Sequence, residues 1–536
     1  MKKDEKLLIR ESSGLIKHFG MKDAAGKVLT LVLPLAAYYT LLYSPGVPGA
    51  NNFGLSALIG FLFAIPPFYI YLRLSELIPR SSGEYIYISR FLHSLIGTIQ
   101  GITNIITVPL LAAFTTIELT VIAGFVPSIQ LIGFAIRDYG LVYLGYSILT
   151  NPTYLFITSA IFTILFGVII SLHNKYMSWV VLVSMVLGQI AGPIIASAIF
   201  FIGGNTLFVS SYNNLLTIFS QSGSYQSLYN QGSSLVAPFN VFTTIVFAIL
   251  IWIWEYSWFF GPSYFAGEYK GGRKTIRYGM IIGWILADFF VALLSAAAEY
   301  AIGLNFFNYA SLNGWGNVPV SFGEGFVIWA GIMVLNNPIL LWTLAITGFL
   351  AELAISIVLL SLSARVVLAM SFDRLLPEKL STVTKSGAPI LGSLLVTGIS
   401  LFWVYMQTLG GFAITSIGIL SILMIYQMLP AIVSAILLGK RKILGDMISD
   451  EDSKKLVIIG ILAAVDLLIS VGLALGYSII NTTYASIVFA GNALDTNALI
   501  IALPVLGTVY YLGIKKYREK VNGLDIEKLF KVLPPE

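Results

Sequence analysis

The chain has 536 residues, of which 57% are apolar and only 11% are charged, and its mean hydropathy is +0.87. Soluble domains have about 25% charged residues, so the ionised groups are too few to cover several soluble domains. Disordered chains are poor in aromatic residues, whereas this chain has 34 Phe, 28 Tyr and 9 Trp. The composition indicates a polytopic membrane protein.

Residues 1–27 are charged and polar, so no cleavable signal peptide is expected and the first apolar segment is predicted to be a membrane anchor. A spanning helix needs about 20 mostly apolar residues, and the runs are too continuous for the strands of a membrane barrel. The sequence therefore predicts an all-α protein with twelve spans, near residues 28–44, 55–78, 95–125, 152–172, 177–202, 240–264, 276–303, 338–370, 388–409, 412–438, 455–478 and 497–514.

The basic residues orient these spans. With an even number of crossings, all of the 31 Lys and Arg residues except Arg137 fall on the side of the N-terminus. The positive-inside rule makes that side the cytoplasm. We expect a multi-pass protein of the cell (plasma) membrane with both termini cytoplasmic. The net charge of +5 then reflects topology, and a nucleic-acid partner is not expected.

Residues 203–239 form the longest expected outer loop, rich in Ser, Asn, Gln, Tyr and Gly and free of charged residues. An ordered cap over the outer vestibule is the favoured interpretation. The alternative is adaptation to an acidic exterior, in which surface carboxylates would lose their charge near a pKa of about 4.

The residues of common enzymatic sites are scarce. There is no Cys, and the three His residues, His18, His93 and His173, are isolated in the sequence. The segment at residues 20–28 resembles a phosphate loop poorly, because it has an extra residue between its glycines and no Ser or Thr after Lys27. We expect no enzyme activity, no cofactor and no metal site.

Carboxylates do occur at membrane depth, where a charge costs at least about 2.5–3.5 kcal/mol. Such residues pair, become protonated or line a watered cavity, and a protonated carboxyl bonded to a neighbouring helix is the structural alternative for each. Counted along the helices, the candidates are Glu255, Asp288, Glu352 and Asp466 near the midplane, with Glu118 and Glu299 nearer the outer surface.

Two spans contain predicted breaks. In span 6, aromatic residues flank Glu255 and the Gly261–Pro262 pair follows, which removes a backbone donor. Span 1 contains Pro34. Breaks five helices apart are typical of inverted-repeat transporters, whose freed backbone groups line a site, and a simple proline kink is the rival interpretation for each. The expected repeats are residues 28–202 and 240–438, within a core at 28–438.

Three segments resemble those of the amino acid–polyamine–organocation (APC) superfamily permeases. One follows span 2, one follows span 6, and one follows span 8 and ends in a Leu-Pro loop. The matching residues are Glu76, Pro79, Gly83 and Tyr85; Gly267, Glu268 and Lys270; and Arg365, Met370, Asp373, Leu376, Pro377 and Pro389.

The resemblance implies a leucine-transporter-like fold of five-plus-five inverted repeats, with substrate bound where helices 1 and 6 unwind. Family members hold the substrate carboxylate at a Gly-Ser-Gly-like motif, which this chain replaces with residues lacking glycine. The substrate-binding candidates are Leu35, Ala36, Ala37 and Tyr38 with Ile253, Trp254, Glu255, Tyr256, Ser257 and Trp258. The coupling-ion candidates are Glu255, Asp288, Glu352, Ser356 and Glu118. Span 5 lacks the lysine that replaces sodium in some relatives.

The expected function is secondary active transport of amino acids or related amines by alternating access. Coupling to H+, coupling to Na+ and exchange all remain open, and the lipid bilayer is the other expected partner. The alternatives are an integral-membrane enzyme and a transceptor or channel without uphill transport. Beyond the core we expect a cytoplasmic loop at 439–454, two further spans within 455–514 and a cytoplasmic tail at 515–536.

Overall fold

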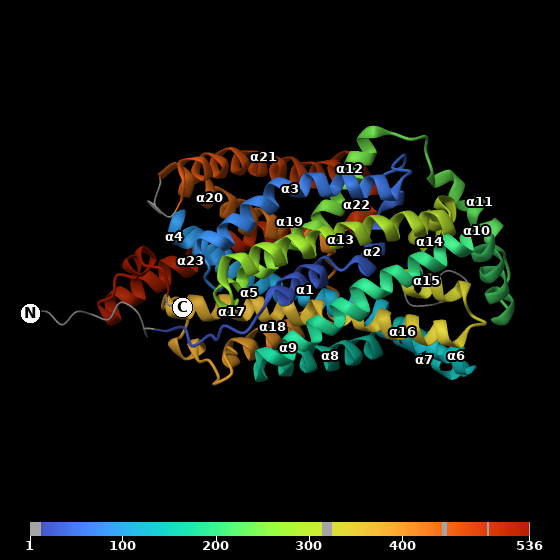
Figure 1. The fold of residues 1–536 in the computed structure, drawn as a ribbon, viewed down its shortest axis with the longest axis horizontal. Helices are drawn as coiled ribbons and strands as arrows, with labels where there is room; N and C mark the ends of the chain where they lie inside the picture. The colour runs from blue at the N-terminus through green and yellow to red at the C-terminus, as the bar shows by residue number, and fades with distance from the viewer. Residues whose placement is uncertain (1–11, 314–323, 442–447, 490–492, 535–536) are drawn as a thin grey trace, which may run out of the picture.

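The computed structural model describes residues 12–313, 324–441, 448–489 and 493–534. These residues are almost entirely helical, and two isolated bridges, Phe19 with Tyr269 and Ser81 with Phe265, are the strand-like pairings among them. The helices lie along one long axis, and the first and last described segments of the chain lie toward the same end of the bundle (Figure 1). We call this the terminal end.

Eleven described helices are long and apolar enough to cross a membrane, and a bent pair near the N-terminus makes a twelfth candidate. We number them as spans 1–12: Met21–Ala36 with Tyr38–Gly46, Phe53–Leu77, Ser94–Ile136, Pro152–Leu172, Asn174–Ile218, Val241–Tyr264, Gly272–Ile302, Pro338–Phe372, Ile390–Thr408, Ser416–Lys440, Asp450–Ile480 and Thr496–Asn522. The all-helical fold and the twelve predicted apolar runs are thereby confirmed.

Most spans are a single helix or two helices joined at a break. The helices are α1 (Met21–Val32), α2 (Tyr38–Leu41), α3 (Phe53–Leu77), α5 (Ser94–Thr115), α6 (Val126–Ile136), α8 (Pro152–Leu172), α9 (Asn174–Val183), α10 (Gly192–Ile218), α12 (Val241–Trp254), α13 (Gly272–Ile302), α16 (Pro338–Leu353), α17 (Ile355–Phe372), α18 (Ile390–Thr408), α19 (Ser416–Leu423), α20 (Leu429–Arg441), α21 (Asp450–Ile480) and α23 (Ala493–Asn522).

Shorter helices connect the spans. At the terminal end these are α4 (Glu84–Phe91) and single turns such as η7 (Ala266–Glu268), and at the opposite end they are α7 (Tyr139–Thr150), α11 (Tyr225–Gly232), α14 (Leu304–Asn313), α15 (Phe326–Met333) and α22 (Thr482–Val488). The expected loop at 439–454 and the expected terminal segments fall partly outside the described residues.

The segment 203–239 is largely helical, which differs from the expected loop. Helix α10 continues to Ile218, and α11 packs against α14. This stretch is rich in polar residues, and aromatic rings provide its packing contacts. Tyr225 stacks on Phe306 with ring centroids 4.7 Å apart. An ordered layer therefore covers the end of the bundle opposite the termini.

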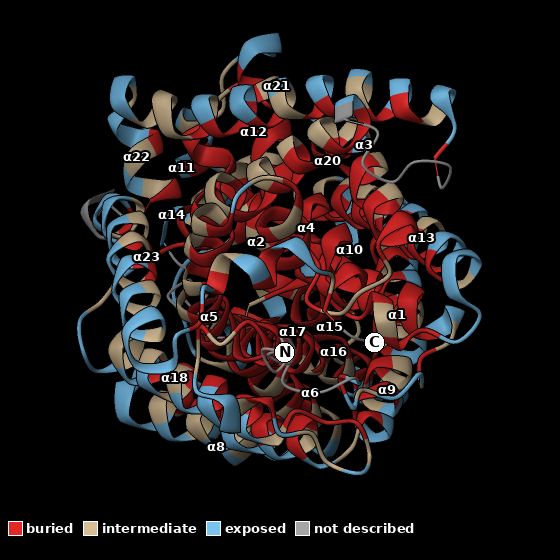
Figure 2. Ribbon diagram, turned by 90° about the vertical axis from the view of Figure 1, so that its left-hand side faces the viewer, coloured by how far each residue is buried: buried red, intermediate tan, exposed pale blue. Residues whose placement is uncertain are grey.

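The outer surface of the bundle is apolar. Buried residues fill its centre, while exposed residues lie on peripheral helices such as α8, α18, α21 and α23 (Figure 2). Many of these exposed side chains are large and aliphatic; Ile161 is 60% exposed and Ile458 is 61% exposed. Such a surface is suited to lipid, since large contiguous apolar patches are rare on soluble monomers.

Spans 1 and 6 are both broken and pack against each other at the centre. Helix α1 ends at Val32, Leu33 has a left-handed backbone (φ 58°), and a short turn begins at Pro34. In span 6, α12 ends at Trp254 and a 3₁₀ segment, η6 (Tyr256–Tyr264), continues to the end of the span. A 3₁₀ run of this length is unusual, since such runs seldom exceed 3–4 residues.

Glycine permits the close approach of the two broken spans. A Cβ added at Gly261 would lie 2.2 Å from the Cδ1 of Leu31. The structure therefore places the altered backbone of span 6 beside the last turn of α1.

Candidate functional site at the broken helices

A hydrogen bond joins the two broken helices. The Thr40 hydroxyl, in α2, donates to the Glu255 carboxyl at 2.9 Å, and both side chains are fully buried. Glu255 is the residue at which span 6 changes from α-helix to 3₁₀. Its second oxygen, Oε2, has no hydrogen-bond partner among the described residues. One carboxyl oxygen thus remains available where the two breaks meet.

Aromatic rings from three spans line the same region. Tyr39 packs against Trp254 at 5.7 Å between centroids and edge-on against Phe114 at 5.5 Å. Trp258 continues this lining one turn further along span 6, at 6.1 Å from Trp254. The breaks therefore lie beside an aromatic wall that suits the apolar part of a ligand.

Several carboxyl groups converge on Tyr38, the first residue of α2. Its hydroxyl is buried without a hydrogen-bond partner among the described residues. Four carboxyls interact with this phenol electrostatically: those of Glu118, Glu255, Glu324 and Glu352. Burial raises the pKa of Glu324, which lies between spans, to about 7. Such a cluster attracts an ammonium group or holds protons, because neighbouring like charges cannot all ionise cheaply.

Helix α15, between spans 7 and 8, covers this cluster from the end opposite the terminal end. Phe326 and Trp329, both in α15, meet the Tyr38 ring edge-on at 6.2 and 5.8 Å. A Cβ added at Gly325 would lie 3.4 Å from the same ring. The aromatic residues of α15 therefore close this side of the break.

Spans 3 and 8 share a cluster of hydroxyl groups near Glu352. Ser356 lies 2.8 Å from the Thr115 hydroxyl and accepts from Thr116 at 3.0 Å. Its hydroxyl also lies 3.3 Å from the carbonyl oxygen of Ala112. Oxygen ligands of this type suit hard cations, although here they bond to one another and join the two spans.

Some predicted site residues lie away from this centre. The Tyr256 ring turns toward span 2, where it meets Phe61 edge-on at 5.7 Å, and its hydroxyl interacts with Asp288 in span 7. Leu35 points toward span 5, since a Cβ at Gly192 would lie 2.6 Å from it. The Tyr256 phenol thus interacts with both Asp288 and Glu255, whereas Asp288 is not among the carboxyls that act on Tyr38.

The remaining predicted residues are buried in the two breaks. Ala36 and Ala37 form the turn between α1 and α2. Their side chains are small and apolar, so the polar groups of this turn are those of its backbone. Ser257 donates to the Ile253 carbonyl at 2.8 Å and borders a separate cavity toward span 10.

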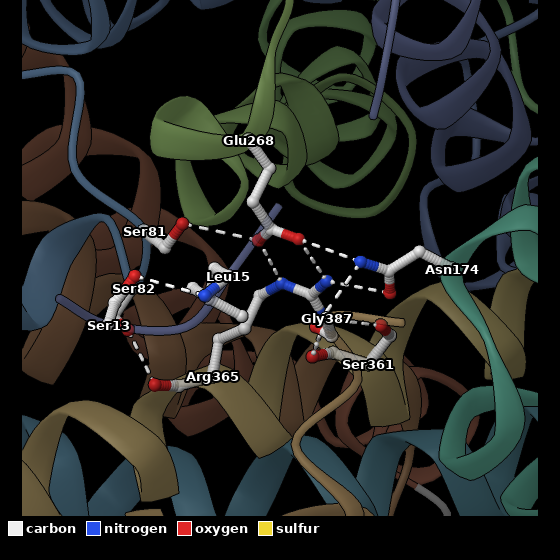
Figure 3. A network of polar contacts seen from close by, with 9 residues as sticks. All are labelled: Ser13, Leu15, Ser81, Ser82, Asn174, Glu268, Ser361, Arg365 and Gly387. Carbon is white, nitrogen blue, oxygen red and sulfur yellow. Dashed lines mark hydrogen bonds and ion pairs between the residues drawn. The ribbon is translucent and has the colours of Figure 1, made fainter. Parts of the chain in front are cut away.

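A buried ion pair lies at the terminal end of the bundle, and Figure 3 shows the network of polar contacts around it. Arg365, in α17, binds both carboxylate oxygens of Glu268 at 2.6 and 2.7 Å, and neither side chain is more than 1% exposed. Asn174 donates to Glu268 at 3.1 Å, and Ser361 accepts from Arg365 at 2.7 Å. The network joins span 5, the segment after span 6 and span 8.

The sequence did not single out Thr40, Tyr39 or Glu324 as site residues. Their signals were weak, because a hydroxyl or phenol in an apolar helix is common and Glu324 lies in a connecting segment. Glu268 belongs to a segment with several charges, since Lys270 lies two residues further on, whereas Arg365 is an isolated charge within an apolar run. That isolation is the signal from which a buried partner could have been expected.

Comparisons with known proteins agree with this architecture. A sequence model of the family described as "Amino acid permease" matches residues 19–510. "Uncharacterized protein 399" of Sulfolobus islandicus rod-shaped virus 1 is 24% identical over 505 residues, which cover 94% of this chain and 97% of that protein.

The fold also matches a solved transporter. The crystal structure of MhsT in complex with L-phenylalanine superposes with a TM-score of 0.53 at 14% identity, covering 86% of this chain and 99% of that one. This likeness confirms the predicted leucine-transporter-like fold.

Proposed function

Because the chain belongs to the amino acid permease family, we propose that it moves amino acids or related amines across the cell membrane by alternating access. The orientation of the basic residues supports a cytoplasmic terminal end. The inverted repeats would then occupy residues 28–202 and 240–438, and the site lies where their first helices break.

The Thr40–Glu255 contact carries the substrate assignment. It supplies a buried carboxyl, with one oxygen free among the described residues, between two broken helices. An ammonium group satisfies such an oxygen with a charge-assisted hydrogen bond. MhsT, whose fold is similar, was solved in complex with L-phenylalanine, and this supports an amino acid as the ligand.

The substrate side chain and carboxylate need separate partners. Tyr39, Trp254 and Phe114 provide the aromatic wall. Backbone groups at the break from Leu35 to Tyr38 would hold the carboxylate, since helix ends leave N–H and C=O groups without intrahelical partners. Glu118, Glu352 and Ser356 remain the candidates for ion coupling. The two carboxyl groups favour transport coupled to H+ over exchange without a coupling ion.

A thermal-shift panel of amino acids and amines at two pH values tests the substrate class. A ligand that binds only the folded protein stabilises it by RT ln(1 + [L]/Kd), about 2.7 kcal/mol at a hundredfold excess over Kd. Stabilisation by amino acids or amines supports the proposal. The absence of any shift across the panel, together with no uptake in proteoliposomes, would refute it.

Glu255→Gln tests the role of the carboxyl. The hydrogen bond to a charged group is worth about 1.5–3 kcal/mol, so substrate affinity should fall roughly tenfold to a hundredfold. Asp466→Asn, in peripheral span 11, is the matched control and should bind as the unmodified protein does. Unchanged affinity and an unchanged pH profile in Glu255→Gln would contradict this assignment.

A further inference from the structure

A second buried carboxyl lies outside the site at the breaks. Glu84 is the first residue of α4, between spans 2 and 3, and is only 1% exposed. Two phenols hold it: the Tyr71 hydroxyl of span 2 donates to Oε1, and the Tyr264 hydroxyl of span 6 donates to Oε2. The carboxyl therefore links α4 to the end of the broken sixth span.

An amide network extends from this carboxyl into spans 3 and 10. The Tyr264 hydroxyl lies 3.1 Å from the Gln427 Oε1 and accepts from the Asn104 Nδ2 at 3.1 Å. Gln427 Nε2 and Asn104 Oδ1 are buried without hydrogen-bond partners among the described residues. Tyr264 can thus donate its single proton either to Glu84 or to Gln427.

The titratable groups that face Glu84 are all phenols. They are Tyr71 of span 2, Tyr264 of span 6 and Tyr87 of its own helix, and the described residues provide no cation against it. Burial raises the pKa of Glu84 to about 7, even though the hydrogen bonds from Tyr264 and Tyr71 act in the opposite direction. Neither charge state is therefore strongly favoured near neutral pH.

A cavity adjoins this carboxyl. It is small, and Glu84, Ser257, Phe260 and Gln427 contribute to its wall together with apolar residues of span 10. Ser257 and Phe260 belong to η6, which begins directly after Glu255. The cavity therefore lies between Glu84 and the segment in which we place the substrate site.

We propose that Glu84 is a proton-binding site that couples the charge state of this network to the position of the sixth span. When the carboxylate is ionised, it accepts from both phenols and holds Tyr264 against spans 2 and 3. When a proton from solvent binds the oxygen that faces Tyr264, that oxygen becomes a donor. Tyr264 then donates to Gln427 instead, and its bond to Glu84 reverses, with the carboxyl as donor. This inference rests on the proposed transport function for its role, but the proton site itself can be measured without transport.

Infrared difference spectra of the purified full-length protein, taken between about pH 5 and pH 9, test the site directly. We expect the C=O band of a buried protonated carboxyl to disappear on raising the pH, and to be missing in Glu84→Gln. Asp466→Asn should retain it. A spectrum of Glu84→Gln that keeps every carboxyl band of the unmodified protein would overturn the proposal.

Tyr71→Phe provides a second variant that preserves the carboxyl. The phenol donates to the ionised form, so its removal should shift the midpoint of the band to higher pH. A midpoint that stays in place, or moves lower, would overturn the proposal even if Glu84→Gln fails to fold.

Proteoliposomes test the coupling. With a mixture of radiolabelled proteinogenic amino acids, Glu84→Gln should retain exchange of labelled for unlabelled substrate and lose acceleration by an imposed pH gradient. Acceleration equal to that of the unmodified protein would refute the coupling. Absence of all uptake by the unmodified protein would instead refute the proposed function, and the infrared result would stand.

Discussion

The contribution of the Arg365–Glu268 ion pair to the stability of the terminal end can be tested quantitatively. Glu268→Gln keeps the size of the side chain and removes its charge, so the guanidinium of Arg365 stays buried without its counter-charge. Removing one partner of a buried pair costs about 3–5 kcal/mol. The upper part of this range is expected here, because both carboxylate oxygens bind Arg365, at 2.6 and 2.7 Å.

Arg365→Met completes a double-mutant cycle. Alone it leaves the Glu268 carboxylate buried and should cost a similar free energy, about 3–5 kcal/mol. The double variant removes both charges, so its loss should be far smaller than the sum of the single losses.

The free energy of unfolding can be measured by tryptophan fluorescence during denaturant titration in detergent. Arg374→Met is a suitable control, because Arg374 meets Glu378 at 3.5 Å near the surface, where ion pairs contribute about 0–1 kcal/mol. If the losses of unfolding free energy in the two single variants add up in the double variant, Arg365 and Glu268 do not stabilise the fold as an ion pair.

Two further predictions concern stability. Gly188→Ala should lower the free energy of unfolding by about 1–3 kcal/mol through overpacking, because the added Cβ would lie 2.4 Å from the Ala351 backbone. Gly472→Ala is the control and should be neutral or stabilising, because a Cβ there would meet nothing within 4 Å. Equal shifts of the melting temperature in the two variants would refute this reasoning. The displacement of the Glu84 pKa from 4.5 to about 7 favours the protonated folded form by roughly 3 kcal/mol. That contribution is complete below pH 4.5 and lost as the pH rises through 7. Thermal unfolding of Glu84→Gln should therefore depend less on pH over this window, and an equal slope would contradict the assignment.

The sequence predicted the spans well, because a continuous apolar run of about 20 residues satisfies its backbone groups in a bilayer only as a helix. It also predicted that spans 1 and 6 are broken. The Gly261–Pro262 pair does not mark the residue at which the second break begins. Pro262 lies inside the 3₁₀ segment, while the change of helix type begins at Glu255. A proline shows which hydrogen bond is missing, but packing decides over how many turns the helix adjusts.

The meeting of carboxyls around Tyr38 was not predictable. Sequence position gives the depth of a residue, whereas the direction it faces depends on how its helix is rotated. Glu118 lies in a π-helical segment, Thr116–Phe125, which alters the face presented by the following turns. Asp288 has the same expected depth as Glu255 and Glu352 but lies against Tyr256, whose ring turns toward span 2.

The N-terminal segment connects the first helix to the segment that follows span 6. The amides of His18 and Phe19 donate to the Glu268 carbonyl at 2.9 and 3.1 Å, and Lys270 donates back to Phe19 at 2.8 Å. The ammonium of Lys27, in α1, lies 3.5 Å from the centre of the Phe19 ring. The first helix and the segment after span 6 are therefore tied directly to each other. Any movement that separates Glu268 from Arg365 by displacing this segment would carry α1 with it.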